Sequence, residues 1–114
     1  MAVGETQQFV WDYSERSNIL NIHRKDKKTT GSAELGDFTV DFDTAGHIVG
    51  LEIMNVADFL KEAEISPEQL SHLVSAEMII REKKSGVIYI WIKFMLPQNI
   101  EKKIPIPAPV MAQT

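Results

Sequence analysis

The sequence predicts an α+β fold, an antiparallel sheet of about six strands built from three hairpins with one or two short helices inserted. Three observations predict it. Long runs of the chain alternate apolar and polar residues, as half-buried strands do. The stretches between these runs contain the Gly, Ser, Asn and Asp residues typical of turns. One segment in the second half has helical spacing instead, and the length of 114 residues fits a single domain.

A first hairpin is predicted over residues 9–22, with a polar loop at residues 14–18. Its strands place their apolar side chains on one face: Phe9, Trp11, Tyr13, Leu20 and Ile22. Residues 23–36 contain two glycines and several basic side chains without a sustained period, which predicts a mobile loop.

A second hairpin is predicted over residues 37–54, with its turn at residues 43–46. The carboxylate of Asp43 suits the first position of a type I turn, and Gly46 suits a left-handed backbone. Two short helices should follow, at about 56–63 and 67–73. Residues 66–69 provide an N-cap serine, a first-turn proline and a capping-box glutamine for the second helix.

A third hairpin is predicted from the alternation at residues 76–80, the turn 83–86 and the strand 87–96. The last strand is apolar on both faces, so both faces need cover, by core and helix or by core and another subunit. Its second face supplies the candidate interface residues, Tyr89, Trp91 and Met95, and makes a homodimer one of the two expected arrangements.

Two parts of the chain are expected to differ in organisation. Residues 1–97 should form the single α+β domain, and residues 98–114 a Pro-rich extended arm, because prolines are excluded from central strands.

Composition excludes several classes of function. A net charge of -4 argues against a broad nucleic-acid surface. The absence of cysteine excludes disulfides, thiolate zinc sites and cysteine nucleophiles. The N-terminus does not resemble a secretory signal, and the longest apolar run, 87–96, is about half the length of a membrane-spanning helix. A cytoplasmic protein without a membrane segment or cofactor is expected.

Residues 41–52, DFDTAGHIVGLE, resemble a calcium-binding loop on paper. Asp41, Asp43, Gly46 and Glu52 occupy expected positions, and the carboxylates Asp41, Asp43 and Glu52 are therefore the candidate metal ligands. The flanking segments alternate as strands, whereas a calcium loop of this type joins two helices, and Ala45 has no side-chain oxygen to bind a metal. A hairpin turn explains the spacing better.

Other chemical motifs are sparse. The three histidines, His23, His47 and His72, are not at ligand spacing, and the chain has no G-x-S-x-G nucleophile motif. A basic cluster of Arg24, Lys25, Lys27 and Lys28 lies in the expected loop and is interrupted by Asp26. Such a cluster is typical of a solvated loop, with nucleic-acid contact as the alternative.

Two segments resemble a known family. Tyr13–Ile22 is similar to the opening Y-D-x-E-x-D-x-L-Y-I, and Asp41–Val56 to the D-x-D-x-x-G-x-I-V-G-I-E-I-L-x-A, of small prokaryotic proteins known as domain of unknown function 2283. Ser14, Asn18 and Asn21 depart from that pattern, and the second half of the chain looks like an extension found in longer members. The resemblance implies a compact α+β domain with an antiparallel sheet, and it implies no activity.

Three functions follow as hypotheses. The favoured one is a non-enzymatic module that self-associates as a dimer, or binds a protein partner, through the strand 87–96 and the Pro-rich arm. One alternative is a metal- or ligand-binding enzyme that uses Asp41, Asp43, His47 and Glu52. The other is an antitoxin-like regulator linked to nucleic acid through the basic loop.

Overall fold

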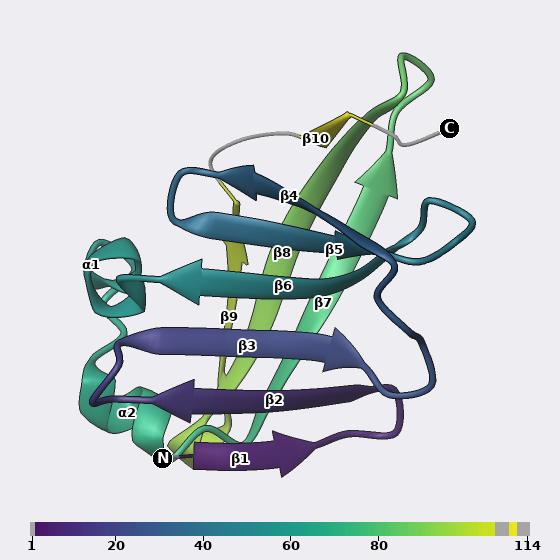
Figure 1. The fold of residues 1–114 in the computed structure, drawn as a ribbon. Coiled ribbons are helices and arrows are strands. Elements are labelled where there is room, and N and C mark those ends of the chain that lie inside the picture. Colours follow the sequence, from purple (N-terminus) through teal and green to yellow (C-terminus); the bar gives the residue numbers. More distant parts are fainter. Residues whose placement is uncertain (1, 107–109, 112–114) are drawn as a thin grey trace.

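The computed structural model describes residues 2–106 and 110–111, and their strands form two antiparallel sheets. Figure 1 shows the strands of one sheet running across those of the other, with both helices at one end. The fold is thus mostly antiparallel sheet with two short helices. The predicted single sheet of about six strands is wrong, because the helices separate the third hairpin from the first two and this hairpin builds a second layer.

The first sheet has six strands in the order β1-β2-β3-β6-β5-β4. The predicted first two hairpins are present as β2–β3 and β5–β6, and β3 and β6 join them. The bounds are β1 Ala2–Glu5, β2 Phe9–Ser14, β3 Ile19–Arg24, β4 Gly31–Leu35, β5 Phe38–Phe42 and β6 Ile48–Met54.

The predicted mobile loop at residues 23–36 is wrong for residues 23–24, which end β3, and for residues 31–35, which form the edge strand β4. β4 pairs with β5 through a two-residue turn at Gly36 and Asp37, where Gly36 has a φ of 64°. Glycine adopts this left-handed backbone conformation without steric cost. The weak apolar alternation of residues 31–35 reflects a strand exposed at an edge.

The second sheet contains the predicted third hairpin, β7 (Ser75–Glu82) and β8 (Val87–Leu96). Two further strands, β9 (Ile100–Pro105) and β10 (Val110–Met111), pair with β8 along its other edge. A short 3-10 turn at Pro97–Asn99 leads into β9. Part of the segment predicted as an extended arm is therefore an edge strand, a place that tolerates proline. Residues 107–109 and 112–114 of that segment lie outside the described residues, and the division of the chain at residue 97 stays a prediction.

Both predicted helices are present and slightly shorter than expected: α1 spans Val56–Lys61 and α2 spans Pro67–Ser71. The capping box is confirmed for α2, because the Ser66 side chain accepts from the Gln69 backbone N–H at 3.1 Å and the Gln69 side chain accepts from the Ser66 N–H at 2.9 Å. Pro67 opens the helix, as its missing N–H and fixed φ favour.

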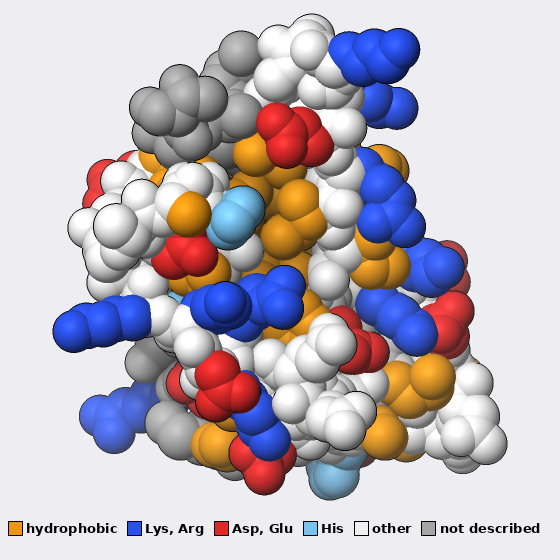
Figure 2. All heavy atoms as spheres, turned by 90° about the vertical axis from the view of Figure 1, so that its right-hand side faces the viewer, with side chains coloured by type: hydrophobic (Ala, Val, Ile, Leu, Met, Phe, Trp, Pro, Cys, Tyr) orange, Lys and Arg blue, Asp and Glu red, His pale blue; other side chains and the backbone are white. Residues whose placement is uncertain are grey.

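The core lies between the facing sides of the sheets, and its buried side chains among the described residues are all hydrophobic. Alternate residues of β2, β3, β5, β7 and β8 enter it, and the buried residues of the helices, Val56, Leu60 and Leu70, belong to the same cluster. Figure 2 faces the end away from the helices and shows hydrophobic side chains at its centre with charged side chains around them. The helices therefore cover one end of the core and do not lie over the outer faces of the sheets.

Candidate interaction surface

Strand β8 has one buried face and one partly exposed face. From Ile88 to Leu96, every second side chain is buried in the core. The side chains between them point outward, and four of these five are apolar or aromatic: Val87, Tyr89, Trp91, Lys93 and Met95. Tyr89 is 37% exposed, and Trp91 and Met95 are partly exposed. The three predicted interface residues thus share one outer face.

The neighbouring strands extend this apolar surface. The register places Ile79 of β7 and Pro105 of β9 on either side of Trp91. We call the outward residues Ile79, Val87, Tyr89, Trp91, Met95 and Pro105 the aromatic face. The rings of Tyr89 and Trp91 lie 6.3 Å apart at 37°, and the Lys83 ammonium lies 5.9 Å from the centre of the Tyr89 ring. Sequence reasoning missed Ile79 and Pro105, because their place depends on the pairing register.

Charged residues border the aromatic face in a mixed pattern. Glu77 lies opposite Lys93 across the β7–β8 pair, and the Lys93 ammonium lies 3.5 Å from a carboxylate oxygen of Glu101. Arg81 lies opposite Tyr89 at the other end. The aromatic face is seen edge-on at the right-hand margin of Figure 2, where cationic, acidic and hydrophobic side chains alternate. An apolar centre with a charged border is typical of protein-binding surfaces.

The outer face of the six-stranded sheet has a different character. We call its row of polar side chains the carboxylate face: Asp12, Asn21, Glu34, Thr39, Asp41 and Glu52. Asn21 donates to Asp12 at 3.3 Å, and the hydroxyl of Ser32 donates to Asp41 at 2.6 Å. The register places Glu52 between Asn21 and Thr39. Of the predicted metal ligands, Asp41 and Glu52 therefore share this face.

The third predicted metal ligand, Asp43, serves the β5–β6 turn. One of its carboxylate oxygens accepts backbone N–H groups of His47 at 2.9 Å and Ala45 at 3.0 Å. The hydrogen bond from His47 is the main cause that lowers the pKa of the Asp43 carboxyl. Gly46 has a φ of 84°, so the predicted turn geometry is present. No group of three or more His, Asp or Glu residues in the described part of the chain is placed to hold a metal ion.

Gly50 of β6 lies beside Asp41 of β5 and His23 of β3 on the outer side of the six-stranded sheet. A Cβ at this position would lie 2.6 Å from a carboxylate oxygen of Asp41 and 2.7 Å from the His23 ring. Both flanking side chains therefore lean over a gap that only glycine leaves open. The His23 ring is held by the Arg24 carbonyl at 2.7 Å and the Thr29 hydroxyl at 2.9 Å. A glycine inside a strand was the available signal for this close approach.

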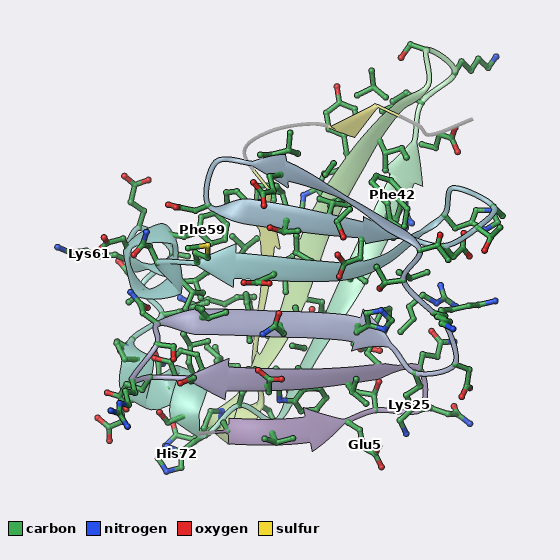
Figure 3. All side chains as sticks on the ribbon, viewed as in Figure 1. Glu5, Lys25, Phe42, Phe59, Lys61 and His72 are labelled. Atoms are coloured by element: carbon green, nitrogen blue, oxygen red, sulfur yellow. The ribbon has the colours of Figure 1, made fainter. Side chains whose placement is uncertain are left out.

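The basic loop is partly neutralised within the chain. The Lys25 ammonium lies 3.0 Å from the Glu5 carboxylate, and Figure 3 shows these two residues at the same corner of the six-stranded sheet. The Arg24 guanidinium lies 5.9 Å from the centre of the Phe9 ring. His47 is an exposed turn residue, and His72 contacts the Glu68 carbonyl at 3.0 Å on α2. The three histidines are placed in three different local settings.

Comparison with known proteins bears on the first half of the chain. The model of the family described as protein of unknown function (DUF2283) matches residues 11–56. These residues run from within β2 to the start of α1 and include β3, β4, β5 and β6 in full. Searches of curated proteins and of solved structures found no match. None of the helices in residues 2–106 and 110–111 is long and apolar enough to cross a membrane. The segment from residue 11 to residue 56 is therefore similar to the DUF2283 family of proteins of unknown function.

Proposed function

We propose that this chain is a non-enzymatic interaction domain that binds a polypeptide through the aromatic face. One observation carries the proposal: β8 is apolar on both sides, and only its inner side is covered by the core. A sheet face that meets only water normally alternates polar outward residues with apolar inward ones. The middle of the six-stranded sheet, with the carboxylate face, follows that rule and has exposed Val10 and Met54 only towards strand ends, whereas the centre of the aromatic face does not follow it.

The helices do not supply the missing cover. The buried residues of α1 and α2 pack into the core between the sheets, and Tyr89 remains 37% exposed. Aromatic side chains contribute large contact areas at low cost in conformational entropy, and Tyr and Trp are enriched among residues that dominate binding. Tyr89 and Trp91, which lie side by side at the centre of the face, are the residues best suited to that role.

Native mass spectrometry of the protein purified from its own cells tests this proposal. We expect the wild type to carry a bound polypeptide, either a second copy or another protein, and Trp91→Glu to lose it. Asn21→Lys on the carboxylate face, which places a cation between Asp12 and Glu52, is the matched control and should keep it. Tyr89→Ser serves as a second, milder variant, because Tyr89 is the more exposed of the two aromatic residues. Identical spectra for the wild type and both aromatic-face variants, with all proteins folded by circular dichroism, would contradict the proposal.

A further inference from the structure

We propose that the occupant of the aromatic face is a second copy of this chain, joined in a two-fold symmetric dimer. This inference rests on the proposed function and adds the identity of the partner. The support is the pattern of charged and apolar groups on this face, which is complementary to the same face of a second copy related by a two-fold rotation. Closed two-fold dimers are the commonest form of protein self-assembly.

The pattern follows from the register of the four-stranded sheet. Ile79, Trp91 and Pro105 form a row across β7, β8 and β9. Along β7, Glu77 lies two residues to one side of this row and Arg81 two residues to the other. Along β8, Lys93 and Tyr89 occupy the same relative positions. On β7 the two sides of this row therefore carry opposite charges, and on β8 they carry a cation and an aromatic ring; Lys103 of β9 lies level with Lys93.

A two-fold axis that lies in the interface along this row reverses the strand direction of the copy. Ile79 and Trp91 then face their own counterparts, which places apolar groups against apolar groups. Glu77 faces Arg81 of the second copy, and Arg81 faces Glu77, so two ion pairs form. On β8, the Tyr89 ring faces Lys93 of the second copy, a cation–π arrangement. Val87 faces Met95 of the copy, which again joins two apolar side chains.

The geometry tolerates the usual angle between packed sheets. Aligned sheets cross at about 30°. Two residues along a strand span about 7 Å, so this rotation displaces a charge from its counterpart by only about 3.5 Å. The long side chains of Glu77 and Arg81 reach across such a displacement. The predicted pairs therefore do not depend on perfectly parallel sheets.

Two-fold pairing with a copy through the carboxylate face, on the other side of the molecule, is unfavourable. The carboxylate face carries Asp12, Glu34, Asp41 and Glu52 without a lysine or arginine among its row members. Stacking this face on a copy would bring like charges together and strip water from polar groups. Electrostatics therefore selects the aromatic face for pairing between copies.

Charge exchange tests the arrangement by sedimentation velocity on the full chain. Glu77→Arg and Arg81→Glu should each turn the dimer into a monomer, because each variant faces two like-charged pairs. An equimolar mixture of the two variants should form a heterodimer, because every Glu then faces an Arg. Glu15→Arg and Arg16→Glu, in the exposed loop between β2 and β3, are the matched controls and should leave the wild-type dimer unchanged.

Folding is checked on every variant by circular dichroism, since Glu77→Arg also places a cation beside Lys93. Glu77→Gln and Arg81→Gln avoid that conflict and should each raise the dimer dissociation constant by about tenfold or more. A dimer that survives both charge reversals, or a mixture that stays monomeric, would overturn the inference. A monomeric wild type would overturn it as well. If native mass spectrometry then showed a different polypeptide lost in Trp91→Glu, the interaction domain would stand without the dimer; no bound polypeptide at all would reject both.

Discussion

The outer faces of the two sheets differ, although their inner faces contribute to one apolar core. On the six-stranded sheet, the outward residues in the middle of the central strands are polar, as in Asn21 and Glu52, and outward apolar residues such as Met54 lie at the strand ends. On the four-stranded sheet, the central strand turns Tyr89 and Trp91 outward. The inward side chains of both sheets are hydrophobic, so the difference between the sheets lies in their outward side chains. The first outer face is typical of a sheet in contact with water, and the second is typical of a surface that binds protein, as we propose.

The largest expected effect is a loss of stability on substitution of the inner side of β8, compared with a small loss on its outer side. Phe94 is fully buried, and Phe94→Ala should lower the free energy of unfolding by about 3–5 kcal/mol, through lost contacts and a cavity. Tyr89→Ala on the outer side should cost about 1 kcal/mol or less when the chain is dilute, because surface substitutions remove little packing. Urea denaturation measures both values. Equal losses would show that the outer side is packed as tightly as the core.

Trp91→Ala should weaken association more than it weakens the fold. Central aromatic residues of interfaces cost about 2 kcal/mol or more on truncation, which raises the dissociation constant about 30-fold. Sedimentation over a concentration series measures this change. Asn21→Ala, at a comparable central place on the carboxylate face, is the control and should leave the dissociation constant unchanged. A similar effect of both substitutions would remove the distinction between the faces.

Gly50→Ala probes the carboxylate face itself. The added methyl group would collide with Asp41 and His23, so we expect a loss of about 1–3 kcal/mol in stability. Gly31→Ala is the matched control, because nothing lies within 4 Å of a Cβ at that position. It should change stability by about 0.5 kcal/mol or less. Chemical denaturation measures the free energy of unfolding of both variants. Equal values would show that Asp41 and His23 move aside freely.

The smallest effect concerns the turn at the edge of the carboxylate face. The pKa of Asp43 is lower in the folded chain than in the unfolded one, chiefly through the His47 backbone N–H. The ionised carboxylate therefore stabilises the fold at pH values above the ordinary pKa of about 4, and this contribution disappears as the pH falls through the lowered value. Thermal unfolding from pH 7 to pH 2 should show a gap between wild type and Asp43→Ala that narrows in acid. A constant gap would rule out the charge as its source.

Local features of the fold could be predicted from the sequence. The three central hairpins and both helices were visible because period and capping act over a few residues, as with Ser66 and Gln69. The turn at Gly36 and Asp37 carried a usable signal for β4, which the basic residues before it obscured. The division into two sheets was not predictable. It depends on which hairpins pair with one another, and such pairings, as of β3 with β6, join residues far apart in the sequence.

The candidate surface was predicted in part. A strand apolar on both sides identified Tyr89, Trp91 and Met95, whose shared outer face follows from strand alternation alone. Ile79 and Pro105 join them only through the register of β7 and β9. The match between Glu77 and Arg81 is likewise a property of the assembled sheet, since it depends on which residues lie level with Trp91.

Hydroxyl-radical footprinting compares the two outer faces most directly, because each carries a methionine that reports its exposure. Met95 lies on the aromatic face, and Met54, which is 45% exposed, lies on the outer side of the six-stranded sheet. As the protein concentration rises through the association range, oxidation of Met95, Tyr89 and Trp91 should fall while oxidation of Met54 stays constant. Equal behaviour of Met54 and Met95 across the series would contradict the account.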